Sequence, residues 1–302
     1  MSAGSPDGSS APDDATPTEP VIGPALPPGR TIDVPGLGST FLRELPGPPN
    51  APVVVLLHGW TVTADLNWFA CYEALGRRFR VVAPDLRGHG RGPRARPFTL
   101  EACADDIALL LGELGIEQAI AVGYSMGGAI AQLAWQRHRS SVSGIVLCAT
   151  AASFKENRQE HLSFLGLAGL ANLARLTPTP VRQWVADRYL ARRADALEAW
   201  ALDEISRNDP AAVLEAGAAI GQFSSLDWIG ELDVPAAVLV TMTDDVIPLR
   251  RQLELQRALP NAVTFRIDGR HDVAARRPDQ FVSSLLKACT IVAERGRTAR
   301  AS

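Results

Sequence analysis

The chain has 302 residues, 46% of them hydrophobic and 21% charged, which is enough apolar material for a sizeable core in one or two domains. Its 30 Lys and Arg residues nearly balance its 33 Asp and Glu residues, so the net charge of −3 gives no reason to expect binding to nucleic acid or anionic membranes. The longest apolar runs are far shorter than the roughly 18 residues that cross a bilayer, and no membrane span is predicted.

Residues 1–30 are rich in Ser, Pro, Ala and Gly. They contain too few apolar side chains to offset the entropy that ordering would cost, so a disordered tail is predicted. The tail also lacks the basic start and the apolar segment of a secretory signal. Together with four scattered cysteines that show no zinc-site spacing, this predicts a cytoplasmic protein with reduced thiols and no bound metal. The sequence gives no indication of the oligomeric state.

From residue 31 onward, short β-type runs alternate with helical patterns. Two runs separated by a Pro-Gly-Leu-Gly turn predict a hairpin over 31–34 and 40–45. Further apolar runs predict buried strands over 53–57, 80–83, 118–123, 142–148, 236–241 and 263–267. Apolar residues spaced three and four apart predict helices over 100–114, 126–138, 249–259 and 279–294. This alternation predicts an α/β fold: a mostly parallel, eight-stranded sheet with helices on both faces.

One stretch, residues 151–225, interrupts the alternation because it is helical in pattern and contains no convincing strand. We therefore predict an all-helical insertion between two parts of the core, 31–150 and 226–295. Such an insertion either adds packing or forms a lid over a pocket.

The strongest functional motif is Gly123–Gly127, which reads G-Y-S-M-G. A bare G-x-S-x-G match is weak, because chance matches are common. Here it follows a predicted buried strand and opens a predicted helix, which favours a sharp turn that lifts the Ser125 hydroxyl above the sheet edge. The alternative is an ordinary turn serine.

Two further motifs, His58–Trp60 (H-G-W) and Asp85–Gly90 (D-L-R-G-H-G), each follow a predicted strand before Ser125. With them, the chain resembles the α/β-hydrolase family over nearly all of residues 31–295. The resemblance implies a serine nucleophile followed in the chain by an acid and then a histidine. Dehalogenases and epoxide hydrolases of this fold are disfavoured, since their nucleophile is an aspartate where this chain has Ser125.

The resemblance implies His271 as the base, because it follows a predicted strand in a loop that matches the family's histidine loop. His58 resembles a structural histidine of the family. For the acid, related hydrolases usually place the carboxylate four residues before a proline, which favours Asp244 over Asp245. The sequence departs from the family at Thr241, where a glycine is common.

Negative charge that develops on a substrate carbonyl needs two hydrogen-bond donors. The family resemblance implies the backbone N–H groups of Met126 and Trp60 for this oxyanion hole. We predict substrate contacts for Trp68 and Tyr124, with Trp60 and the neighbours of Trp68, Asn67 and Phe69, on one wall of the pocket.

In the family, a helical cap commonly covers the crevice that holds the nucleophile, and Trp184 and Trp200 would make that cap apolar. We therefore predict a serine hydrolase that cleaves a mainly apolar ester, thioester or lactone through an acyl-enzyme on Ser125, with a small hydrophobic acyl compound as partner and no cofactor. The same triad serves carbon–carbon bond hydrolases and cofactor-free perhydrolases. A ligand-binding receptor with slow turnover is the alternative outside the enzymes.

Overall fold

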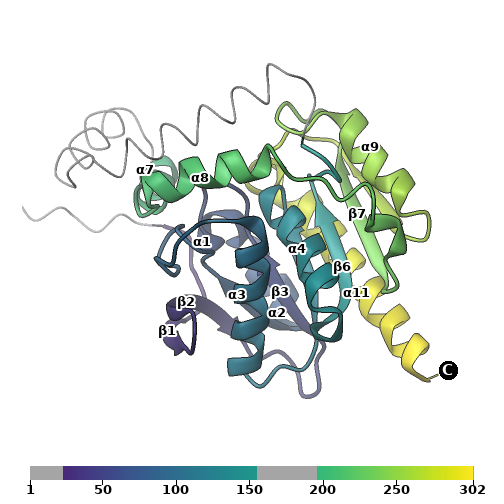
Figure 1. The fold of residues 1–302 in the computed structure, drawn as a ribbon, viewed down its shortest axis with the longest axis horizontal. Coiled ribbons are helices and arrows are strands. Elements are labelled where there is room, and N and C mark those ends of the chain that lie inside the picture. The colour runs from purple at the N-terminus through teal and green to yellow at the C-terminus, as the bar shows by residue number, and fades with distance from the viewer. Residues whose placement is uncertain (1–22, 155–195, 302) are drawn as a thin grey trace, which may run out of the picture.

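The computed structural model describes residues 23–154 and 196–301. An eight-stranded sheet runs through them in the order β1-β2-β4-β3-β5-β6-β7-β8 (Figure 1). Strands β1 and β2 form an antiparallel hairpin and β2 pairs antiparallel with β4, whereas all other neighbours are parallel. The strands are β1 Gly29–Val34, β2 Gly38–Leu45, β3 Val53–Leu57, β4 Arg80–Pro84, β5 Ala119–Tyr124, β6 Val142–Cys148, β7 Ala236–Thr241 and β8 Val263–Ile267.

Helices connect the strands and cover the sheet on both sides (Figure 1). The α-helices are α1 Ala64–Trp68, α2 Tyr72–Gly76, α3 Leu100–Glu113, α4 Met126–Arg137, α7 Ala196–Ser206, α8 Pro210–Ile220, α9 Leu249–Ala258, α10 Val273–Arg276 and α11 Pro278–Ala301. The connections that the structure describes also contain the 3₁₀ helices Arg139–Ser141 and Ile229–Glu231.

Strand β3 illustrates how the sheet separates two apolar cores. Val55 and Leu57 belong to the core beneath α3, α4 and α9, whereas Val54 and Leu56 belong to the core beneath α2 and α11. All four side chains are at most 1% exposed. Because successive residues of a strand point to opposite faces, a continuous apolar run is what a doubly covered strand requires. The predicted fold, a mostly parallel eight-stranded sheet with helices on both faces, is confirmed.

The stretch between β6 and β7 is not helical throughout. Near its start, Ser153 forms an isolated antiparallel bridge with Ser224. Helices α7 and α8 do form; they lie at the top of the view in Figure 1, where α7 contacts α1 and α8 contacts α3. Residues 155–195, which include Trp184, lie outside the described residues, as do residues 1–22 of the predicted tail. The predicted domain boundaries stay a prediction.

Helix α11 is the longest helix of the described chain and extends from Pro278 to Ala301, beyond the predicted range of 279–294. In the described part of the chain, no helix is both long and apolar enough to cross a membrane.

Candidate active site

The turn between β5 and α4 presents Ser125 at the carboxyl edge of the sheet. Ser125 has φ +53° and ψ −117°, which is costly for a non-glycine residue and persists only where the surroundings impose it. Its N–H donates to Cys148 O at 2.9 Å, and Thr150 Oγ1 donates to Ser125 O at 2.8 Å. At Gly127 a Cβ atom would lie 2.1 Å from Leu57 O, so only glycine fits there. This turn, residues 124–127, is called the elbow below; contacts with the two strands that flank β5, which are β3 and β6, hold it in place.

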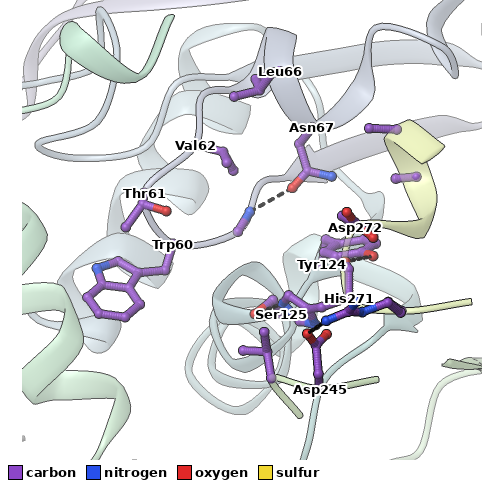
Figure 2. A pocket seen from close by; sticks show the side chains of 15 residues that line it. Trp60, Thr61, Val62, Leu66, Asn67, Tyr124, Ser125, Asp245, His271 and Asp272 are labelled. Atoms are coloured by element: carbon purple, nitrogen blue, oxygen red, sulfur yellow. Dashed lines mark hydrogen bonds and ion pairs between the residues drawn. The ribbon is translucent and has the colours of Figure 1, made fainter. Parts of the chain in front are cut away.

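Ser125, His271 and Asp244 form one hydrogen-bonded chain. His271 Nε2 lies 3.0 Å from Ser125 Oγ, and His271 Nδ1 lies 2.9 Å from Asp244 Oδ2. Asp244 follows β7 and His271 follows β8, so the carboxyl ends of three parallel strands bring the side chains together. Figure 2 shows Ser125 and His271 side by side at the cavity. Tyr124 Oη donates to His271 O at 2.5 Å, which holds the histidine loop against β5.

Protein donors, and not solvent, supply the hydrogen bonds to the buried carboxylate of Asp244. Burial is the largest influence on it and by itself raises the pKa, but hydrogen bonds from His271, Thr241 Oγ1 and the Ile247 N–H outweigh burial, so the pKa lies below its ordinary value. The Val246 and Ile247 N–H groups donate to Oδ1 at 2.9 and 2.8 Å. Asp244 therefore stays a carboxylate at neutral pH.

The loop after β3 is fixed by His58, whose side chain is fully buried. Burial lowers the pKa of His58 to about 4, so its imidazole is neutral. Nε2 accepts the Leu86 N–H at 2.9 Å, which leaves Nδ1 to donate to Gly59 O at 2.8 Å. The Gly59 N–H in turn donates to Asn67 Oδ1 at 2.8 Å (Figure 2).

Above Ser125 lies a cavity of about 530 Å³. Figure 2 shows Trp60, Thr61, Val62 and Leu66 along one side of it. The lining is mainly apolar on that side, and charged side chains gather near His271. The lining residues are Gly59, Trp60, Thr61, Val62, Leu66, Asn67, Tyr124, Ser125, Asp245, Val246, Arg270, His271, Asp272, Ala274 and Ala275. A serine hydroxyl at the floor of a mainly apolar cavity is an arrangement that can hold a small organic molecule against that hydroxyl.

A comparison with protein-family models matches residues 52–275 to the α/β-hydrolase fold. The chain belongs to the α/β-hydrolase fold family. Within the described residues of this hydrolase, no group of three or more His, Cys, Asp or Glu side chains is placed to hold a metal ion.

The curated proteins and solved structures that are similar to this hydrolase include esterases and lactonases. It is 34% identical to a pimeloyl-acyl-carrier-protein methyl ester esterase from Aromatoleum aromaticum, over 72% of this chain and 90% of the relative. It is 23% identical to 3-oxoadipate enol-lactonase 1 from Acinetobacter baylyi, over 81% of this chain and 91% of the relative. The structure of the enol-lactonase from Burkholderia xenovorans LB400 superposes with a TM-score of 0.70 at 26% identity, covering 86% of this chain and all of that one. The protein is a hydrolase that resembles carboxylic ester hydrolases.

Two predicted wall residues of the hydrolase do not reach the cavity. Trp68 is 0% exposed and packs edge-on to Tyr124, with ring centroids 6.1 Å apart, so it lies behind the cavity lining and the predicted substrate contact stays a prediction. Phe69 packs against Trp200 at 5.6 Å instead. The reason is the short helix α1, which turns the Trp68 ring into the core beneath the site, whereas Phe69, at the C-terminal end of that helix, faces α7. Tyr124, Trp60 and Asn67 do line the cavity.

Several lining residues of the hydrolase were not predicted. Val62 and Leu66 come from the loop before α1 and from α1 itself, and Ala274 and Ala275 come from α10. These helices have only five and four residues, which is too short to show a helical spacing in the sequence. Their proximity to the H-G-W and histidine motifs is the one feature that would have indicated them.

Proposed function

We propose that this hydrolase cleaves a mainly apolar ester, thioester or lactone through an acyl-enzyme on Ser125. The observation that carries the proposal is the continuous hydrogen-bonded chain from Ser125 Oγ through His271 to Asp244, at the floor of a largely apolar cavity. A serine hydroxyl is a poor nucleophile alone, and an adjacent base supplies what it lacks.

In the proposed acylation, Ser125 Oγ attacks the substrate carbonyl carbon while His271 Nε2 accepts the hydroxyl proton. Asp244 accepts a hydrogen bond from His271 Nδ1, which keeps the other nitrogen free to take that proton. The imidazolium then donates the proton to the departing oxygen or sulfur, and the acyl group stays on Ser125. In deacylation, water attacks the acyl carbon, His271 takes a proton from that water, and the acid leaves as Ser125 regains its proton.

For the oxyanion hole we propose the backbone N–H groups of Trp60 and Met126. Among the described residues, neither amide donates a hydrogen bond to a protein acceptor. Met126 opens α4, so its amide is one of the helix N-terminal donors that no residue of the helix can satisfy. Two such donors aimed at one oxygen stabilise the charge that forms only during attack.

The lining supports an apolar acyl or alcohol group, which Trp60, Val62, Leu66 and Val246 would contact. The names of the relatives favour an ester bond: one acts on a methyl ester and another on an enol-lactone, which is a cyclic ester. A carbon–carbon bond hydrolase or a perhydrolase would use the same three side chains. These functions, and a receptor that binds ligand with little turnover, are outcomes of the test below.

The test combines a fluorophosphonate probe with a panel of aryl esters of increasing chain length. We expect wild-type protein to be labelled and to turn over repeatedly, and Ser125→Ala to lose labelling and at least about a thousandfold in kcat. Ser140→Ala removes an exposed serine far from the cavity and is the matched control, with labelling and kcat kept. Labelling that survives in Ser125→Ala would contradict the proposal. Ligand-induced stabilisation without multiple turnover would favour the receptor.

A further inference from the structure

The loop that carries Trp60 has a backbone conformation that its own sequence disfavours. Thr61 has φ +66°, the left-handed region, where a β-branched side chain is crowded. Thr61 is also part of the cavity lining, directly after the proposed oxyanion donor Trp60 (Figure 2). A residue in such a conformation relaxes unless neighbouring groups hold it.

The holding groups come from the α7–α8 segment, Ala196–Ile220, far along the chain. Asn208 Nδ2 donates to Thr61 O at 2.7 Å, and Trp60 Nε1 donates to Val213 O at 2.7 Å. Two residues after Thr61, the hydroxyl Oγ1 of Thr63 donates to the buried carboxylate of Glu204 at 2.7 Å. None of the described residues of this segment lines the cavity. Its described part therefore contacts the site through the loop at 60–63 and through α1, which packs against α7.

Asn208 is itself fixed in orientation. It lies between α7 and α8, and its Oδ1 accepts the Gly90 N–H at 2.7 Å. With a donor on one side and the Thr61 carbonyl on the other, only one assignment of the amide oxygen and nitrogen satisfies both contacts. The next residue, Asp209, donates its N–H to Gly88 O at 2.9 Å, which ties the same turn to the loop after β4. Asn208 thus bridges two loops of the core.

We propose that Asn208 is a positioning residue for the oxyanion loop: its amide holds Thr61 in the left-handed conformation and so sets the direction of the Trp60 N–H. This inference rests on the proposed function, because it assigns the Trp60 N–H to the oxyanion. A misdirected donor weakens binding of the transition state more than binding of the substrate. The effect of losing Asn208 therefore falls on kcat and not on KM.

A purely structural role, in which Asn208 only anchors the α7–α8 segment, predicts something different. Arg96 anchors the same segment by ion pairs to Asp209 at 2.7 Å and Glu215 at 3.2 Å, without touching residues 60–63. Arg96→Gln is therefore the matched control. If anchoring alone matters, the two substitutions have similar effects.

The experiment is a double-mutant cycle on Asn208→Ala and Thr61→Gly, measured with a short-chain aryl ester. In the wild-type background we expect Asn208→Ala to lower kcat by about tenfold to a hundredfold, less than the full loss of an oxyanion donor, with KM changed less than threefold. In the Thr61→Gly background the same substitution should cost less than threefold, because glycine takes positive φ without steric cost. Arg96→Gln should keep kcat within threefold.

Hydrogen exchange of the Gly59 amide, which precedes Trp60 and donates to Asn67 Oδ1 at 2.8 Å, gives a readout that does not depend on turnover. We expect faster exchange there in Asn208→Ala and unchanged exchange in Arg96→Gln. The inference is overturned by an equal cost in both Thr61 backgrounds, by a loss confined to KM, or by an Arg96→Gln effect as large as that of Asn208→Ala. If the wild type hydrolyses no ester, the proposed function fails, and unchanged exchange in Asn208→Ala overturns the loop-holding role separately.

Discussion

At the scale of single residues, the carboxylate of Asp244 accepts hydrogen bonds on both oxygens, and one of its donors stands where the family commonly has glycine. Thr241 Oγ1 donates to Asp244 Oδ2 at 2.6 Å. Gln252 Nε2 reaches the same threonine oxygen at 2.8 Å and Asp244 Oδ2 at 3.2 Å. A threonine here therefore adds a donor that glycine lacks, and it couples the acid loop to α9. The departure from the family supports the carboxylate.

Replacing Asp244 tests whether its charge matters beyond its shape. The asparagine of Asp244→Asn can still accept hydrogen bonds from the Val246 and Ile247 N–H groups. It lacks the charge that would stabilise a His271 imidazolium in the proposed mechanism, and its amide favours the wrong tautomer of the imidazole. We expect kcat to fall by about a thousandfold to ten-thousandfold, as when asparagine replaces the triad aspartate in serine proteases. Steady-state kinetics on an aryl ester measure this fall in kcat.

The control for that substitution is Asp268→Asn, on the histidine loop. Asp268 forms an exposed ion pair with Arg277 at 2.9 Å and does not line the cavity. Exposed pairs of this kind contribute little, so kcat should change less than threefold. A similar loss in both variants would mean that kcat responds to any charge removed near His271.

At the scale of elements, the elbow depends on how closely α4 approaches the end of β3. The Cβ of an alanine at position 127 would lie 2.1 Å from Leu57 O and 2.7 Å from His58 O, both of them backbone atoms that cannot rotate away. We expect Gly127→Ala to lower the free energy of unfolding by about 2–3 kcal/mol and to abolish fluorophosphonate labelling of Ser125. Urea denaturation and probe labelling measure the two effects.

Helix α3 offers the matched glycine. At Gly112 an added Cβ meets no atom within 4 Å, so Gly112→Ala should raise the free energy of unfolding by about 0.5–1 kcal/mol through helix propensity, with labelling kept. Equal destabilisation by the two alanines would argue against close approach at the elbow.

Some strands and helices can be predicted from the sequence, and others cannot. Buried strands such as β3 and β7 were predicted at their observed bounds, because a continuous apolar run flanked by turn residues has few other solutions. Helices α1 and α10 were not predicted, because helices of five and four residues are too short to show a helical spacing of apolar residues. Because the sequence does not show α1, it also does not show that this helix turns Trp68 into the core and away from the cavity wall.

Part of the candidate site can likewise be predicted from the sequence, and part of it cannot. Motif context predicted that Ser125, Asp244 and His271 lie on neighbouring loops, and the structure brings them within hydrogen-bonding distance. The contact between Asn208 and Thr61 joins residues 147 apart in the chain. Neither the left-handed conformation of Thr61 nor its contact with Asn208 leaves a local pattern in the sequence, so only the folded structure shows it.

At the scale of the whole molecule, two buried histidines link folding to pH. His58 and His89 are both fully buried, with ring centroids 5.4 Å apart. Burial lowers the pKa of His58 to about 4. Burial, and then the neighbouring His58, lower the pKa of His89 to about 3. Both rings are therefore neutral in the folded protein at pH 5, whereas an unfolded chain protonates its histidines near pH 6.5.

The sign of the pH effect follows from that difference. Between about pH 6.5 and pH 4 the unfolded state binds more protons than the folded state, so the free energy of unfolding falls as the pH falls. Each buried histidine should account for about 2 kcal/mol of the loss between pH 7 and pH 5. Urea denaturation at the two pH values measures the loss.

His89→Phe isolates one of the two contributions, because phenylalanine keeps a ring against His58 and Phe98 but cannot be protonated. We expect its loss between pH 7 and pH 5 to be smaller than that of the wild type by about 2 kcal/mol, whatever its stability at pH 7. Phe98→Leu is the control: it disturbs the same packing without removing a titrating group, so it should lower stability equally at both pH values. If His89→Phe retains the full wild-type loss, the acid sensitivity arises from groups other than this buried imidazole.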